Sequence, residues 1–243
     1  MYMTNHDFLP LQKETSPAIK GFVESLLRKE TLSLPEKEYL LRYFFKKIAK
    51  VTNYNKAYIS VPFVNQRVKS KPQKWAADLI ISHMQIQEIE IGEILGIPTS
   101  GVPLATTIAN KLDHDLVLGR KGNIIPGTWK NPLIIKETAP SFTTGQQSSF
   151  VFNDVPPKVC ITDDVSAQGA TLSLISETFE KKGIKPSFIA LYFAKLFQPG
   201  IRRIYEETGI EPFYAVGVES ITEKGEIVLA PPHFYEDNTT PTP

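Results

Sequence analysis

Two adjacent acidic residues, Asp163 and Asp164, follow an apolar run in the stretch KVCITDDVSAQGAT at residues 158–171. The apolar run predicts a buried strand, so the sequence places two carboxylates side by side at a strand end. Adjacent carboxylates raise each other's pKa unless a cation or ligand hydroxyl groups compensate their charge. The acid pair therefore indicates a site for a positively charged or hydroxyl-rich ligand.

The segment after the acid pair suits an anion. Residues 166–171, SAQGAT, are small and include a glycine, and they lead into a helix predicted from about Gly169 to Lys182. Backbone N–H groups of such a turn, together with the positive end of a helix dipole, can bind a phosphate. The expected phosphate contacts are Ala167, Gln168, Gly169, Ala170 and Thr171. Carboxylates at one end and a phosphate site at the other fit a ribose 5-phosphate. This motif alone leaves open a plainer alternative, a turn whose aspartates are solvated or cap the helix.

Alternating strand and helix patterns begin near residue 58, with YISVPFV at 58–64 as the first expected strand. This alternation predicts an α/β fold in which helices cover both faces of a parallel sheet. Ligands of such sheets bind beyond the carboxyl ends of the strands, which is where we expect the acid pair. Residues 121–152 interrupt the alternation with two strand-like runs around TTGQ, which predicts an inserted β hairpin or flap.

Both ends of the chain differ from this core. Ser16 and Pro17 can begin one helix, and Ser33 with Glu36 can form a capping box for a second. The tail, PPHFYEDNTTPTP, is rich in proline and polar residues. We therefore expect a helical N-terminal extension over 1–57, a core over 58–230 and a flexible tail over 231–243.

Composition excludes several classes of function. The 243 residues include 27 Lys and Arg and 26 Asp and Glu, which gives a formal net charge of only +1. The overall charge is therefore too small to attract nucleic acid or an anionic membrane. No apolar run reaches the roughly 20 residues that span a bilayer. Cys160 is the single cysteine, and the four histidines have no metal-ligand spacing. We expect a cytoplasmic protein with no nucleic-acid or membrane partner.

The run VCITDDVSAQGAT resembles the phosphoribosyl pyrophosphate motif of type I phosphoribosyltransferases. PTSGVPLATTIANKL at 98–112 resembles their pyrophosphate loop, and VLGRKG at 117–122 places two basic residues where the family carries them. The resemblance implies that Asp163 and Asp164 act catalytically by orienting the ribose, and that residues 167–171 bind the 5-phosphate. It implies pyrophosphate contacts from Ser100, Gly101, Arg120 and Lys121. It also implies that residues 121–152 form a hood over the site.

Within this superfamily the chain is most similar to xanthine phosphoribosyltransferases. FVNQ at 63–66, SFTTGQQSSFVF at 141–152 and AKLFQPGIRRI at 194–204 carry the likeness. It implies that Asn65, Lys195 and Phe197 face a purine base. The implied reaction transfers the phosphoribosyl group to a xanthine-type purine, releasing pyrophosphate and forming a nucleoside 5′-monophosphate. The implied cofactor is Mg²⁺, held mainly by substrate oxygens with Asp163 or Asp164 as an optional ligand, and the implied assembly is a homodimer.

Two alternatives stay open. Orotate phosphoribosyltransferases also carry an N-terminal helical arm, but anionic orotate would need further basic side chains near Lys195, whereas Phe197 suits a purine. Transcriptional regulators of this fold sense phosphoribosyl pyrophosphate without catalysis. Residues 1–57 lack the strongly basic recognition face expected of their DNA-binding domain. The loop at Pro98, Thr99 and Ser100 lacks the acidic residue expected in the enzymes, which keeps the sensor possible.

Overall fold

The computed structural model describes residues 16–53, 58–65, 68–122, 131–136 and 149–234. Its centre is a six-stranded sheet in the order β11-β10-β9-β8-β3-β4, parallel throughout except for the antiparallel pair β10 and β11. The strands are β3 (Glu93–Gly96), β4 (Leu116–Leu118), β8 (Lys158–Ser166), β9 (Lys185–Lys195), β10 (Phe213–Ile221) and β11 (Ile227–Leu229). This arrangement confirms the predicted α/β class.

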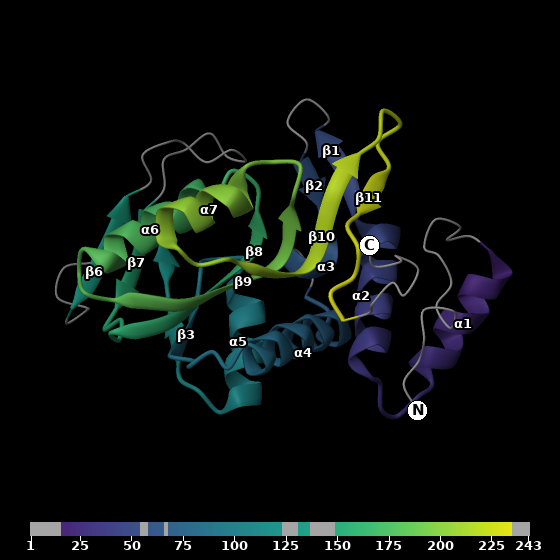
Figure 1. The fold of residues 1–243 in the computed structure, drawn as a ribbon, viewed down its shortest axis with the longest axis horizontal. Helices are drawn as coiled ribbons and strands as arrows, with labels where there is room; N and C mark the ends of the chain where they lie inside the picture. Colours follow the sequence, from purple (N-terminus) through teal and green to yellow (C-terminus); the bar gives the residue numbers. More distant parts are fainter. Residues whose placement is uncertain (1–15, 54–57, 66–67, 123–130, 137–148, 235–243) are drawn as a thin grey trace, which may run out of the picture.

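Helices cover both faces of the sheet. Figure 1 shows α4 (Ser70–Ile86) and α5 (Val102–Leu112) on one side, and α6 (Ala170–Glu180) and α7 (Gly200–Thr208) on the other. Strand β9 shows why two layers are needed, because its side chains alternate between two hydrophobic cores. Ala190 and Tyr192 belong to the core that includes α4 and α5 residues, whereas Ile189 and Leu191 belong to the core that includes α6 and α7 residues.

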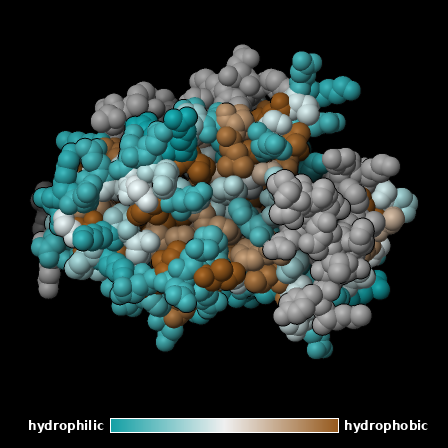
Figure 2. Space-filling view, viewed as in Figure 1, coloured by the Kyte–Doolittle hydropathy of each residue, from teal (hydrophilic) through white to brown (hydrophobic). Residues whose placement is uncertain are grey.

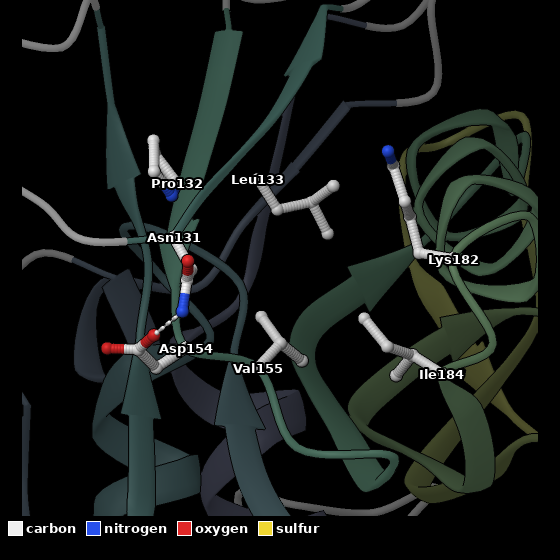
Figure 3. Close-up of a pocket in the computed structure, with 7 residues that line it drawn as sticks. All are labelled: Asn131, Pro132, Leu133, Asp154, Val155, Lys182 and Ile184. Atoms are coloured by element: carbon white, nitrogen blue, oxygen red, sulfur yellow. Dashed lines mark hydrogen bonds between the residues drawn. The ribbon is translucent and has the colours of Figure 1, made fainter.

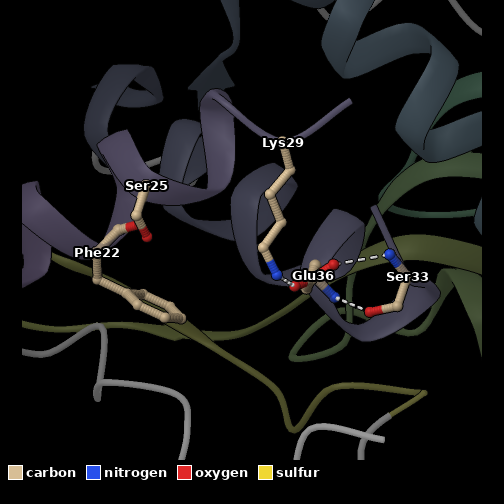
Figure 4. Close-up of polar contacts among 5 residues, drawn as sticks. All are labelled: Phe22, Ser25, Lys29, Ser33 and Glu36. Carbon is tan, nitrogen blue, oxygen red and sulfur yellow. Dashed lines mark hydrogen bonds and ion pairs between the residues drawn. The ribbon is translucent and has the colours of Figure 1, made fainter. Parts of the chain in front are cut away.

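The N-terminal helices begin where the sequence predicts. They are α1 (Pro17–Leu27) and α2 (Leu34–Ile48). Figure 4 shows the capping box of α2, in which the Glu36 N–H donates to Ser33 Oγ at 3.4 Å and the Ser33 N–H donates to the Glu36 carboxylate at 2.8 Å. Lys29 forms an ion pair with the same carboxylate. Each bond satisfies a group that the helix start would otherwise leave unpaired.

These two helices share a core with the sheet. Leu41 and Phe45 of α2 are fully buried, and the Phe45 ring lies 5.1 Å from the ring of Phe193 in β9. Across the expected limit at residue 57, β1 (Lys50–Asn53) pairs antiparallel with β2 (Tyr58–Ser60). The domain limits proposed above therefore stay an interpretation of the sequence, and the described parts on either side pack together.

The inserted segment forms a second sheet, which we call the hood sheet. It comprises β5 (Arg120–Lys121), β6 (Pro132–Lys136) and β7 (Ser149–Asn153), antiparallel in the order β5-β7-β6. Phe152 of β7 is fully buried, and its ring lies 5.8 Å from that of Phe179 in α6. The hood sheet is thus anchored to the α6 side of the molecule. The TTGQ turn falls outside the described residues.

Two segments differ from expectation. The expected strand at 58–64 ends at Ser60, and Pro62 opens the short helix α3 (Pro62–Asn65). Proline lacks an N–H and has a fixed φ, which suits the first turn of a helix better than a strand. In the expected flexible tail, the N–H groups of His233 and Phe234 donate to the Glu38 carboxylate at 2.7 and 2.9 Å. The start of that tail is therefore fixed against α2, while residues 235–243 lie outside the described part.

The face in Figure 2 is hydrophilic over much of its area, with hydrophobic residues gathered across its middle. Among the described residues, no helix combines the length and the apolar character needed to cross a bilayer.

Candidate functional site

Parallel pairing brings three predicted site segments to one edge of the sheet. Strands β3, β8 and β9 are neighbours, so their carboxyl ends meet at the same edge. The Ile97 N–H, just after β3, donates to the Thr162 carbonyl at 2.9 Å. Strand β8 runs further than the sequence indicates, because Ser166 still pairs with Ala194 of β9. The acid pair therefore lies within the paired part of β8, near its carboxyl end, and not after the strand. It also lies just beyond the last residue of β8 that pairs with β3.

The acid pair is almost completely buried. Asp163 and Asp164 are each 9% exposed, and the Asp164 N–H donates to Asp163 Oδ1 at 2.8 Å. Burial raises the pKa of both carboxyl groups, and the charge of Asp164 raises the pKa of Asp163 further. The positive charge of Lys121 opposes both shifts. Two buried acids with raised pKa values favour a cation or hydroxyl donors as a ligand.

The loop after β3 lies directly against this pair. A Cβ atom on Gly101 would come within 2.5 Å of the Thr162 carbonyl oxygen and 2.8 Å of Asp163 Cα. Only glycine allows such a close approach of two backbones. The Gly101 N–H donates to the Ile97 carbonyl at 3.0 Å, which closes the loop just before α5, and the Pro98–Thr99 peptide bond within it is cis. The predicted pyrophosphate residues Ser100 and Gly101 are thus adjacent to Asp163.

The turn over 166–171 is built to leave backbone donors at the start of α6. Gly169 has φ +74°, a conformation that favours glycine, and no side chain caps the helix that begins at Ala170. The first N–H groups of a helix have no acceptor within the helix. Gln168 and Ala170 are exposed, so this end of the helix reaches solvent. A phosphate at that position would accept from backbone N–H groups near the positive end of the dipole.

A buried lysine, Lys195, lies at the same carboxyl edge of the sheet. Lys195 ends β9 and is only 6% exposed; burial lowers its pKa, and the negative charge of Asp164 acts in the opposite direction. Its Nζ lies 5.9 Å from the centre of the Tyr58 ring. Phe197 follows, with 39% of its surface exposed. Lys195 is therefore close enough to the acid pair for their charges to interact, and Phe197 offers an accessible aromatic ring.

Tyr58 is a neighbour of the site that the sequence does not single out. It begins β2, and 137 positions separate it from Lys195 in the chain. An aromatic residue at the start of the first core strand was the only available signal.

For the other predicted site residues, Arg120, Lys121 and Asn65, the structure gives less information about their position relative to the acid pair. Arg120 and Lys121 form β5 of the hood sheet and are exposed; the Lys121 Nζ lies 5.5 Å from the centre of the Phe150 ring. The influence of Lys121 on both aspartate pKa values connects it with the acid pair. Asn65 ends α3, but its side chain lies outside the described part of the structure.

A cavity of about 530 Å³ lies elsewhere. Figure 3 shows it between the hood sheet, the segment before β8 and the segment after α6, with the Asn131 amide donating to Asp154 at 2.9 Å. Its lining residues are Asn131, Pro132, Leu133, Asp154, Val155, Lys182 and Ile184. These residues precede β8 or follow α6, so the cavity is at the amino end of β8, opposite the acid pair.

Asp163 and Asp164 are the candidate protein ligands for a metal ion at this edge of the sheet. Within the described ranges, no group of three or more His, Cys, Asp or Glu side chains is arranged to hold a metal. Two buried carboxylates with raised pKa values nonetheless fit a hard divalent cation such as Mg²⁺, which takes few protein ligands and keeps waters and substrate oxygens.

Curated proteins with similar sequences include transcriptional regulators, and no family model matches the chain. The transcriptional regulator GfcR 1 of Methanosarcina barkeri is 27% identical over 121 residues, covering 49% of this chain and 52% of the relative. GfcR of Thermoplasma acidophilum is 26% identical over 165 residues, covering 68% and 74%. The match thus spans about half the length of the Methanosarcina regulator.

Solved structures with similar coordinates include adenine phosphoribosyltransferases. The Giardia lamblia APRTase, complexed with 9-deazaadenine, matches with TM-score 0.60 and 17% identity over 78% of this chain and all of that one. The Trypanosoma brucei adenine phosphoribosyltransferase, with AMP, pyrophosphate and ribose-5-phosphate, matches with TM-score 0.60 and 20% identity over 76% and 82%. Such likeness at low identity establishes the fold alone. The chain therefore has the type I phosphoribosyltransferase fold that the acid-pair motif predicts.

Proposed function

We propose that the chain binds phosphoribosyl pyrophosphate at the carboxyl edge of its sheet and transfers the phosphoribosyl group to a purine base of the xanthine type. One observation carries the proposal: the Gly101 loop, the buried acid pair and the uncapped start of α6 are contiguous along β8. These three parts suit the pyrophosphate, the ribose hydroxyls and the 5-phosphate of one substrate.

The chemistry is a displacement at C1 of the ribose. A ring nitrogen of the base forms a bond to C1 while the bond from C1 to the pyrophosphate oxygen breaks, and pyrophosphate leaves with the electron pair. The nitrogen then loses its proton to solvent. Positive charge develops on the ribose ring in the transition state, so two fixed carboxylates beneath it stabilise that state more than the substrate. The protein otherwise contributes by holding the reactants in position.

Mg²⁺, when bound, would neutralise pyrophosphate charge, with Asp163 or Asp164 as protein ligands. The pair's own part in the reaction is to accept hydrogen bonds from the ribose hydroxyls. Ser100 would donate to the pyrophosphate, Gly101 would let this loop lie against Asp163, and Arg120 and Lys121 of the hood sheet would offset the pyrophosphate charge.

The base preference rests on Lys195. A buried ammonium group donates hydrogen bonds and accepts none. It suits a purine that presents a ring carbonyl oxygen, as xanthine does, and opposes the amino group of adenine. The Phe197 ring would stack on the base. The adenine named with the structural neighbours is therefore not the base we propose for this chain.

The test is nucleotide formation. Protein, phosphoribosyl pyrophosphate and Mg²⁺ are incubated separately with xanthine, guanine, hypoxanthine, adenine and orotate, and the product is measured. We expect xanthine to react fastest. The Asp163→Asn, Asp164→Asn double variant should lose transfer while keeping its circular dichroism spectrum. The same change at exposed Asp113 and Asp115 is the matched control and should keep full activity.

A second candidate is a non-catalytic regulator that binds phosphoribosyl pyrophosphate, favoured by the names of the curated relatives. Calorimetry separates the two. Binding of phosphoribosyl pyrophosphate without product from any base, together with a gel shift of the protein's own upstream DNA, would favour the regulator. Failure to bind phosphoribosyl pyrophosphate would reject both.

A further inference from the structure

Two glycines fit the 166–171 turn against the start of α7. A Cβ atom on Gly200 would come within 2.3 Å of the Ala167 carbonyl oxygen and 2.6 Å of Ser166 Oγ. A Cβ atom on Gly169 would come within 2.7 Å of the Gly200 carbonyl oxygen. The Gly200 N–H donates to the Ala167 carbonyl at 2.9 Å. The turn and the start of α7 are thus in direct contact at both glycines. Neither position has space for a side chain larger than the hydrogen atom of glycine.

The same segment continues from the proposed base-binding residues. Gly200 follows Lys195 by five positions, and the Gln198 N–H donates to the Lys195 carbonyl at 3.0 Å, which folds the segment into a tight turn. Figure 1 shows α6 and α7 side by side on one face of the sheet. A backbone connection of a few residues therefore joins Lys195 and Phe197 to the turn at the start of α6.

We propose that Gly200 is a positioning residue that sets where the 166–171 turn lies, and so holds the 5-phosphate at a fixed distance from the base-binding residues. The proposal rests on the proposed function and adds a role for a residue that touches no substrate. Its physical basis is that two of the three nearest neighbours of the Gly200 Cβ position, including the nearest, are backbone atoms of Ala167 in the turn. They cannot rotate away as a flexible side chain could, so an added methyl group must displace the turn itself.

The test compares ligands that use different parts of the site. Ribose 5-phosphate needs the turn, whereas pyrophosphate needs the loop at Ser100 and Gly101. In Gly200→Ala we expect calorimetry to show ribose 5-phosphate binding weakened about tenfold or more, since small displacements of a binding group have large effects. Pyrophosphate binding should be unchanged. In turnover, KM for phosphoribosyl pyrophosphate should rise more than kcat falls.

The matched control is Gly21→Ala, the same change in α1 where no atom lies within 4 Å of the added methyl group; it should bind both ligands as the wild type does. Should Gly200→Ala fail to fold, Ile204→Val is the second variant. Ile204 is fully buried in α7, and its Cγ1 lies 3.2 Å from the Cβ position of Gly169. It should show a smaller loss in the same direction.

The possible outcomes are distinct. An equal loss of both ligands, or no loss of either, would overturn the positioning role, because a merely structural defect acts on both. A wild-type protein that binds neither ligand would instead overturn the proposed function, and this proposal with it.

Discussion

Asp163 and Asp164 present a conflict between stability and binding at the level of single residues. Their pKa values are raised by burial, so the folded protein holds their charges less readily than the unfolded chain does. In the protein without ligand, the charged form of the two carboxyl groups is disfavoured. A ligand that compensates their charge would remove this unfavourable energy when it binds. Such uncompensated groups are typical of binding sites, where removing them improves stability and abolishes function.

Asp163→Asn should therefore stabilise the protein near neutral pH. The free carboxyl prefers its protonated form in the folded state, so its contribution to stability is full below the ordinary pKa of 3.8 and is lost as the pH rises through the folded value. Asparagine keeps an oxygen for the Asp164 N–H and carries no charge. We expect a gain in unfolding free energy at neutral pH that disappears below the ordinary pKa, measured by urea unfolding at both pH values.

Asp115→Asn, an exposed change, is the control for that experiment and should show no gain. A gain of equal size at both pH values would show that charge is not its origin. The double variant described above should also gain stability while losing transfer, which connects the two properties in one protein.

Lys195→Gln should change base selection rather than phosphoribosyl pyrophosphate binding. Glutamine is neutral and can both donate and accept, so the strong preference for a carbonyl-bearing purine disappears. We expect kcat/KM for xanthine to fall about tenfold or more relative to adenine, with the dissociation constant of phosphoribosyl pyrophosphate little changed. Lys185→Gln, at the other end of β9, is the control. Unchanged selectivity in Lys195→Gln would exclude this side chain from the base site.

At the scale of elements, local rules explain the helix starts. The capping box of α2 predicts a direct stability effect: Ser33→Ala removes the acceptor for the Glu36 N–H and should cost about 1 kcal/mol of unfolding free energy. Ser25→Ala is the control, because Ser25 is exposed within α1 and alanine has the higher helix propensity. Urea unfolding of both variants measures the difference, and equal stability of the two would show that the cap contributes nothing.

The same local rules explain what the sequence could and could not predict. The α/β alternation, the helix starts at Pro17 and Leu34 and the acid pair follow from patterns within about ten residues, and each was predictable. The extra length of β8 depends on its pairing with β9, and Tyr58 lies beside Lys195 although 137 positions separate them in the chain. The fit of Gly169 against Gly200 is likewise invisible in sequence, because 31 positions separate two residues that look like ordinary turn glycines.

At the scale of the whole molecule, Glu38 connects α2 to the last described residues of the chain. The residue is 1% exposed, and its carboxylate accepts both the His233 and Phe234 N–H groups, 195 and 196 positions away. The proline-rich composition of this segment predicts flexibility, yet two hydrogen bonds to a charged acceptor fix its start. A contact of such sequence separation could not be predicted from either segment alone.

Glu38→Gln should release that segment. One side-chain atom becomes an N–H₂ group that cannot accept, so one backbone N–H loses its partner. We expect a loss of about 1 to 3 kcal/mol in unfolding free energy, and faster amide hydrogen exchange at His233 and Phe234. Glu24→Gln, on the exposed face of α1, is the matched control and should change neither. Unaltered exchange at both amides would show that the carboxylate does not hold the segment.

The buried thiol of Cys160 has a practical consequence. It is the single cysteine of the chain, it is fully buried in β8, and burial raises its pKa to about 12. Maleimide reagents react with thiolates, so the native protein should remain unlabelled. A fluorophore attached to a cysteine introduced at half-exposed Ile134 of β6 would then give a signal free of background. The chain is thus suited to single-site spectroscopy of its hood sheet during substrate addition, with no native cysteine to be removed beforehand.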